Sequence, residues 1–126
     1  MQIVLSHTSK TPLYEQIKQQ IQNQIMTGEL KEGDALPSMR LLAKELNVSV
    51  ITTKRAYEEL EKEGYLFSAV GKGTFVAGQQ PQVLKEWRIR ELENQLEEIV
   101  LEAKKIGLTE QDLHDMVRIY YKEGDR

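Results

Sequence analysis

Residues 49–54 form a run of hydroxyl, β-branched and basic side chains whose composition suits contact with DNA bases. Residues 50–53 are all β-branched, although such residues are poor choices for a helix start. Apolar side chains and threonine methyls contact thymine methyl groups in the major groove, and Lys54 could reach a phosphate or a guanine edge. The alternative is that Ile51 packs inside and the run is incidental. The candidate DNA-contacting residues of this run are Ser49, Val50, Thr52, Thr53 and Lys54.

Two other cations have neighbours that suit phosphate binding. Arg40 follows Ser38, which can cap a helix, and both would lie where that helix crosses a DNA backbone. Lys72 has a glycine on each side, and glycines let a backbone approach phosphates or a minor groove closely. Alternatively, Arg40 is a solvated or ion-paired cation and the glycines only form a tight turn. The remaining candidate DNA-contacting residues are Ser38, Arg40, Gly71, Lys72, Gly73 and Thr74.

The distribution of charge matters more than its sum. A formal net charge of −3, from 17 Lys and Arg against 20 Asp and Glu, by itself argues against a nucleic-acid partner. However, the first 80 residues are balanced, and the acidic excess lies beyond them. Arg55 lies on a different helix face from Lys54 and is placed to pair with Glu58 or Glu59. The N-terminal part can therefore present a locally positive face.

Catalysis and metal binding find little support in the sequence. There is no cysteine, and His7 and His114 lie in no catalytic or metal-ligand motif. The Gly-Lys-Gly-Thr run at 71–74 lacks the spaced glycine and the following helix of a phosphate-binding loop. We therefore expect no enzyme activity, no metal and no cofactor. The sequence has no long apolar run and no signal-like N-terminus, which predicts a cytoplasmic protein without a membrane segment.

The elements that would position these candidates can be predicted from spacing and capping residues. Apolar residues recur every four positions from Leu13 to Ile25, which indicates a first helix. Ser38 and Ser49 can each cap a further helix, and only a short turn separates these two helices. This arrangement predicts a helix-turn-helix whose second, recognition helix covers residues 49–64.

The chain then changes from helical to strand-like patterning. Two β-prone runs flank the glycines and predict a hairpin wing at 65–77. We expect a mainly α fold with a small β-hairpin wing, in which a winged helix-turn-helix domain covers residues 1–78. A polar linker at 79–82 leads to a C-terminal helical hairpin at 83–126.

The C-terminal region is predicted to carry apolar faces on both of its helices. Thr109 and Asp112 form a capping box at the start of the second helix. In the first of these two C-terminal helices, apolar residues are spaced alternately three and four positions apart, a pattern typical of paired helices. Alternatively, this stripe of apolar residues could pack against the winged domain of the same chain. The residues expected to form a homodimer interface are Ile89, Leu92, Leu96, Ile99, Ala103, Ile106, Leu113, Met116, Val117 and Tyr120.

The sequence resembles the DNA-binding domain of GntR-type bacterial transcription regulators over about residues 10–78. The matching segments are Leu36-Pro37-Ser38-x-Arg40-x-Leu42-Ala43, Ala56-Tyr57-x-x-Leu60-Glu61 and Gly71-Lys72-Gly73-Thr74-Phe75-Val76. The short C-terminal region is similar to that of the YtrA-like subfamily, in which it serves dimerisation. The resemblance implies that Arg40, Ser49, Thr52, Lys54 and the 71–74 wing contact DNA. Many relatives carry Arg and Thr where this chain has Val50 and Ile51, so their operator sequences cannot be transferred.

These features predict a sequence-specific DNA-binding transcription regulator, with repression as the expected mode. A homodimer would bind a pseudo-palindromic operator, because two linked copies gain affinity through effective concentration. The alternative is a winged-helix protein-interaction module without a DNA partner. Salt-dependent binding to duplex DNA would distinguish the two. The sequence identifies no effector, although a cleft between the winged domain and the tail, or across a dimer, could bind a small molecule.

Overall fold

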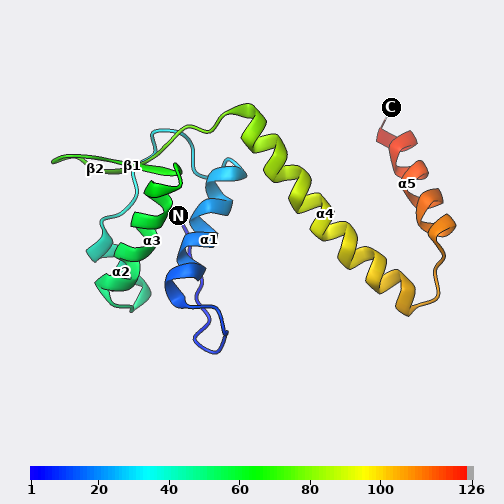
Figure 1. Cartoon of the computed structure of the whole chain (residues 1–126), viewed down its shortest axis with the longest axis horizontal. Coiled ribbons are helices and arrows are strands. Elements are labelled where there is room, and N and C mark those ends of the chain that lie inside the picture. The colour runs from blue at the N-terminus through cyan, green and yellow to red at the C-terminus, as the bar shows by residue number, and fades with distance from the viewer. Residues whose placement is uncertain (125–126) are drawn as a thin grey trace. The chain divides into compact units, whose positions relative to one another are not determined.

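A computed structural model describes residues 1–124 of the chain (Figure 1). Two compact units divide between Leu84 and Lys85. The first holds three helices and a hairpin, and the second holds most of α4 and all of α5. The predicted fold class, a winged helix-turn-helix followed by two C-terminal helices, is confirmed. The elements are α1 (Leu13–Met26), α2 (Met39–Leu46), α3 (Val50–Lys62), β1 (Leu66–Ala69), β2 (Gly73–Val76), α4 (Pro81–Lys105) and α5 (Glu110–Gly124).

The core of the first unit lies between α1 and α3. Ile17 and Ile21, one helical turn apart on α1, have no exposed surface and share a cluster with Leu60 of α3. Burying one such side chain fully stabilises a fold by about 1.5–3 kcal/mol. Leu66 and Val76 extend the cluster into the base of the hairpin. The buried face of α3 is therefore fixed along its length.

A partly buried ionic cluster joins α1 and α3. Lys18 Nζ lies 3.2 Å from Glu59 Oε1 and 2.8 Å from Glu63 Oε2. Arg55 Nε lies 3.1 Å from Glu59 Oε2, and its guanidinium carbon lies 3.7 Å from the centroid of the Tyr14 ring. The hydrogen bond to Glu63 raises the pKa of Lys18, and the hydrogen bond from Lys18 lowers the pKa of Glu59. The predicted pairing of Arg55 is thus confirmed, with Glu59 as its partner.

The turn between α2 and α3 is closed without a glycine. Asn47 ends α2 in the left-handed conformation, with φ of 56° and ψ of 47°. Asparagine is one of the few residues with a side chain that adopts this conformation readily. The Val48 N–H then donates to the Ala43 carbonyl at 3.0 Å. Ser49 follows at once and begins α3.

The hairpin supplies the predicted wing. Its antiparallel strands pair from Leu66 opposite Val76 to Ala69 opposite Gly73. Gly71 and Gly73 have φ of +74° and +112°, which side-chain-bearing residues rarely adopt. The glycines therefore specify the turn whatever the wing binds.

Strand β2 of the wing is paired with the segment that precedes α2. The rings of Phe67 and Phe75 stack across the strands with centroids 5.6 Å apart. On the other edge of β2, Phe75 forms a β-bridge with Ala35, and the Leu36 N–H donates to the Thr74 carbonyl at 2.9 Å. This segment thus extends the two-stranded sheet by a short third pairing.

Helix α4 starts earlier than predicted, within the last residues of the first unit. Helix α4 begins at Pro81, inside the expected linker 79–82, because proline is tolerated at the first helical position. At the start of α5, the Thr109 N–H donates to Asp112 Oδ2 at 2.8 Å, and the Asp112 N–H donates to Thr109 Oγ1 at 3.1 Å. The predicted capping box is confirmed, and its backbone hydrogen bond from Thr109 lowers the pKa of Asp112.

Candidate nucleic-acid interface

The first turn of α3 is an exposed surface of apolar and hydroxyl groups. Ile51 is 79% exposed and Val50 is 40% exposed. The alternative in which Ile51 packs in the core is therefore wrong. Ser49 Oγ accepts the Thr52 N–H at 3.3 Å and lies 2.9 Å from Thr52 Oγ1. The two hydroxyls are hydrogen-bonded to each other. The exposed apolar side chains are therefore the groups of this turn that have the fewest contacts within the protein.

Thr53 requires a correction, because it does not belong to this surface. Its side chain is completely buried, and its hydroxyl lies 2.9 Å from the Met39 carbonyl and 3.0 Å from the Val50 carbonyl. A buried hydroxyl needs such a partner. The prediction that Thr53 contacts DNA is wrong: the residue holds the start of α2 against the start of α3. Its spacing from the buried Ala56 and Leu60 is the signal that could have revealed this.

Lys54, the residue after the buried Thr53, is exposed on α3. Its Nζ lies 3.8 Å from Glu58 Oε1, and both side chains are exposed. An exposed pair four residues apart on a helix is weak. The ammonium group is therefore readily released to a phosphate or a base.

The start of α2 presents a second set of predicted residues. Ser38 Oγ caps the helix by accepting the Leu41 N–H at 3.1 Å. Arg40 is exposed, and residues 1–124 offer it no ion pair, which argues against the intradomain ion-pair alternative. Leu41, which the sequence pattern does not mark as a candidate, follows Arg40 and is 47% exposed.

The wing tip presents a third set. Gly71, Lys72 and Gly73 are exposed, but the Lys72 N–H donates to the Ala69 carbonyl at 2.9 Å within the turn. The Lys72 side chain, rather than its N–H, is thus the group that remains open to a phosphate. Val70 at the tip is fully exposed, and no sequence pattern had marked it as a candidate.

Thr74 lies at the edge of the wing and is half-buried. Its Oγ1 lies 3.3 Å from Ser68 Oγ on the paired strand. A weak hydroxyl pair of this length can be exchanged for another acceptor. Thr74 therefore remains a DNA-contact candidate, less open than the glycines beside it.

The helix ends add a favourable potential to this face. A helix N-terminus carries a positive partial charge and free N–H groups, which attract phosphates. Neither α2 nor α3 has an acidic residue in its first turn, whereas α1 and α5 both do. The acids of α3 begin at Glu58, so the negative charge lies away from the turn that carries Ile51. The balanced first unit thus has a locally positive face.

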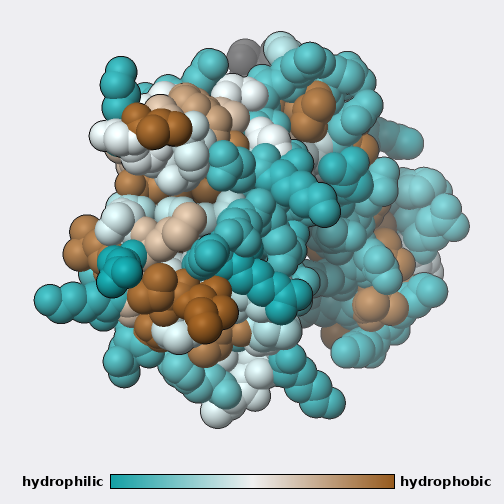
Figure 2. Space-filling view, turned by 60° about the vertical axis from the view of Figure 1, so that its left-hand side comes forward, coloured by the Kyte–Doolittle hydropathy of each residue, from teal (hydrophilic) through white to brown (hydrophobic). Residues whose placement is uncertain are grey.

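The candidate DNA-contacting residues form three sets, at the start of α3, at the start of α2 and on the wing. Hydrogen bonds within the first unit connect these three sets. Thr53 joins the starts of α2 and α3, and the Tyr57 hydroxyl donates to the Pro37 carbonyl at 2.7 Å. The N–H of Leu36, the residue before Pro37, donates to the carbonyl of Thr74 in strand β2 of the wing. Figure 1 shows the hairpin extending outward beside α2 and α3. With that side turned forward, Figure 2 shows brown apolar patches separated by teal hydrophilic side chains.

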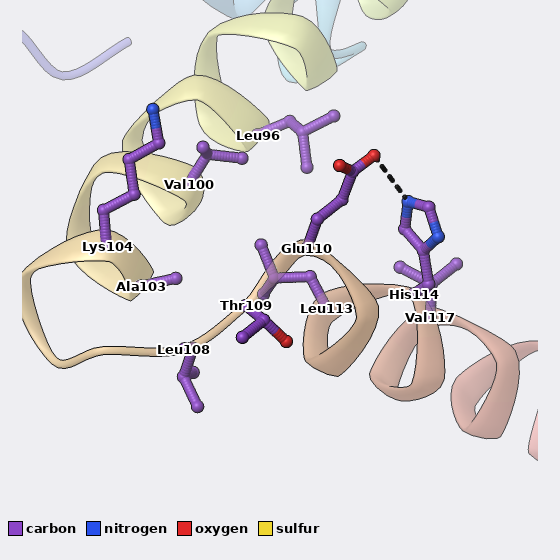
Figure 3. Close-up of a pocket in the computed structure, with 10 residues that line it drawn as sticks. All are labelled: Leu96, Val100, Ala103, Lys104, Leu108, Thr109, Glu110, Leu113, His114 and Val117. Carbon is purple, nitrogen blue, oxygen red and sulfur yellow. Dashed lines mark ion pairs between the residues drawn. The ribbon is translucent and has the colours of Figure 1, made fainter.

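A second candidate surface lies in the C-terminal unit. A groove of 430 Å³ separates α4 from the start of α5, with Glu110 Oε1 and His114 Nε2 3.4 Å apart at its rim (Figure 3). Among the predicted interface residues, Ala103 is already buried by its own chain and Leu113 is half-buried. Ala103 therefore lines the groove instead of forming open surface. The predicted interface residues that remain exposed are Ile89, Leu92, Leu96, Ile99, Ile106, Met116, Val117 and Tyr120.

Within residues 1–124, no group of three or more His, Cys, Asp or Glu side chains could hold a metal ion. No helix in the same part of the chain has the length and apolar character needed to cross a membrane.

The fold and the exposed first turn of α3 define a winged helix-turn-helix protein of the DNA-binding class. The model of the GntR family of bacterial regulatory proteins matches residues 13–76. The HTH-type transcriptional repressor YtrA of Bacillus subtilis is 34% identical over 116 residues, which cover 92% of this chain and 89% of YtrA. The chain belongs to the GntR family, and it is a DNA-binding transcription regulator rather than an enzyme.

Solved structures agree with this assignment. The crystal structure of a transcriptional regulator from Oenococcus oeni has a TM-score of 0.72 and 29% identity, over 94% of this chain and 98% of that one. The DNA-binding domain of AraR in complex with operator ORX1 has a TM-score of 0.54 and 29% identity, over 61% of this chain and 96% of that one. The resemblance found in the sequence, including its short-tailed type, is confirmed.

Proposed function

We propose that the chain is a homodimeric transcriptional repressor that binds a pseudo-palindromic DNA operator. The observation that carries the proposal is the exposed, acid-free first turn of α3 beside the equally acid-free start of α2. In this proposal residues 1–78 bind DNA and the C-terminal helices join two copies. The proposed DNA contacts are Ser38, Arg40, Ser49, Val50, Thr52, Lys54, Gly71, Lys72, Gly73 and Thr74.

The three sets have different expected tasks on DNA. The first turn of α3 would enter the major groove, and Arg40 at the start of α2 would contact the backbone. Lys72 would reach a neighbouring phosphate or the minor groove from the wing. The names of two similar proteins support repression and operator binding in general, since YtrA is a repressor and the AraR domain is bound to an operator.

The dimer part of the proposal follows from uncovered apolar surface. The α4 stripe keeps Leu92, Leu96 and Ile99 more than half exposed, and α5 exposes Val117 and Tyr120. Contiguous apolar surface of this kind marks an interaction site. We infer that the partner subunit covers it and fills the open groove of Figure 3 with apolar side chains. Two linked recognition helices would then read two half-sites.

Salt-dependent binding to a duplex tests the DNA contacts. The operator is first recovered by selecting bound fragments from a random duplex pool, and the proposal expects an inverted repeat. Lys72→Ala should then reduce the slope of log Kd against log salt by about two for a dimer, one for each copy. Lys62→Ala is the matched control, because Lys62 lies at the opposite end of α3. Arg40→Ala should behave like Lys72→Ala.

Two results would contradict the proposal. If neither Arg40→Ala nor Lys72→Ala changed binding at low salt, with the fold intact, these residues would not be DNA contacts. Complete lack of duplex binding would favour a protein-interaction module. A strictly monomeric mass in solution at micromolar concentration would rule out the dimer.

A further inference from the structure

We propose that Ile51, supported by Val50, recognises thymine in the operator by packing against its C5 methyl group in the major groove. This inference rests on the proposed operator binding and adds the base that is read. The operator half-site would then contain a thymine opposite the first turn of α3, and the methyl group itself would contribute affinity.

Folding gives no reason for isoleucine at position 51. Its side chain is 79% exposed and does not belong to the buried cluster around Ile17 and Leu60. A β-branched residue also has a lower helix propensity than alanine or a long polar residue. The residue thus weakens the helix slightly and exposes apolar surface, while its side chain projects from the turn that would enter the groove.

The polar groups of the same turn are poorly placed to read bases. Ser49 and Thr52 bind each other through their hydroxyls, which lie 2.9 Å apart, and Thr53 is buried. Residues 49–53 include no Arg, Lys, Asn or Gln, the side chains that bind guanine or adenine edges through two hydrogen bonds, and Lys54 lies one residue beyond them. The thymine methyl is the apolar group that the major groove presents. It therefore matches the freest side chain of the turn.

The surroundings of Ile51 favour DNA over a protein as the occupant. The starts of α2 and α3 carry no acid, and the exposed cations Arg40 and Lys54 lie near these starts. A polyanion complements an apolar side chain set among helix N-termini and cations. An apolar protein surface would complement only the apolar atoms of Ile51. It would not complement the positive potential of the helix N-termini and the nearby cations.

Replacing thymine by deoxyuridine tests the inference directly, because it removes only the C5 methyl group. Each thymine of the selected operator is replaced in turn, and Kd of the full-length protein is measured at fixed salt. At one position in each half-site the replacement should weaken binding by about fourfold, the effect of one buried methyl group. Replacement outside the half-sites should have no effect.

Protein variants then assign the effect to Ile51. Ile51→Ala should bind the thymine and deoxyuridine operators equally and should unfold no more readily than the wild type, since alanine favours the helix. Val4→Ala removes a similarly exposed side chain (72%) that does not belong to α3, and it should keep the wild-type preference for thymine.

Three outcomes would overturn the inference. Wild-type protein that binds the operator but ignores every deoxyuridine replacement has no methyl readout. Equal thymine preference in Ile51→Ala and the wild type would exclude Ile51 as the reader. Failure to bind any duplex would overturn the proposed function and this inference together, which separates that result from the first two.

Discussion

The hydroxyl of Tyr57 donates a 2.7 Å hydrogen bond to the carbonyl of Pro37, joining the middle of α3 to the residue before the α2 cap. Burial raises the pKa of the Tyr57 phenol, so the group keeps its proton and remains a donor. Tyr57→Phe should lower the free energy of unfolding by about 1–3 kcal/mol, because it leaves the Pro37 carbonyl unpaired. Urea denaturation measures the change. Tyr121→Phe, at an exposed position, is the control, and equal effects of the two would contradict this role.

Thr53 should affect stability and not base contact. Thr53→Val keeps the shape but removes the hydroxyl that binds the Met39 carbonyl, and should lower the free energy of unfolding by about 1–3 kcal/mol. Thr53→Ser keeps the hydroxyl and should retain that hydrogen bond. Both stability and operator affinity are measured for the pair. Unchanged stability in Thr53→Val with lost operator binding would show instead that the hydroxyl contacts DNA.

The ionic cluster on α1 and α3 should make stability depend on pH. Glu59 has a lowered pKa, so its contribution is present above its ordinary value of 4.5 and is lost as pH falls through the lowered value. Lys18 has a raised pKa, so its contribution is present below 10.5 and is lost as pH rises through the raised value. The stability difference between wild type and Lys18→Met should therefore be largest between these two ordinary values.

Urea denaturation of both proteins across this pH range measures the difference. Lys62→Met is a suitable control, since residues 1–124 provide no ion pair for this exposed lysine. A difference between wild type and Lys18→Met that persists unchanged well below pH 4.5 would show that packing of the lysine stem, rather than its charge, is responsible.

The apolar stripe of α4 should control assembly. Leu96→Glu places a charge in the proposed interface and should give monomers in a solution mass measurement. Operator affinity should fall by about 100-fold or more, because the gain from two linked half-sites is lost. Asn94→Glu adds the same charge two residues away, off the stripe, and should remain dimeric. A Leu96→Glu protein that stays dimeric would place the interface elsewhere.

Much of the fold followed from local signals in the sequence. Ser38, Ser49 and the Thr109–Asp112 pair cap their helices as expected, because capping depends on residues within one turn. The four-residue spacing from Leu13 to Ile25 correctly predicted the helix α1. These features need no knowledge of distant parts of the chain.

Features that depend on distant contacts were missed. The residue type of Thr53 predicts a DNA contact, but its partner Met39 lies fourteen residues earlier in the chain. The β-bridge between Ala35 and Phe75 joins segments that carry no shared pattern. The sequence alone does not determine the exposure of Ile51, because an apolar residue at a helix start fits either a core or a contact surface.

The short segment before α2 has a mechanical consequence for binding. Leu36 is bonded to the wing through Thr74, and Pro37 is bonded to α3 through Tyr57. The wing strand β2 and the recognition helix are therefore both hydrogen-bonded to the same two-residue segment. The segment before α2 orders the wing and the recognition helix during folding. DNA binding would therefore cost these elements little further conformational entropy. A half-site with the wrong spacing between its helix and wing contacts would lose one set of contacts, since both elements are bonded to the same segment.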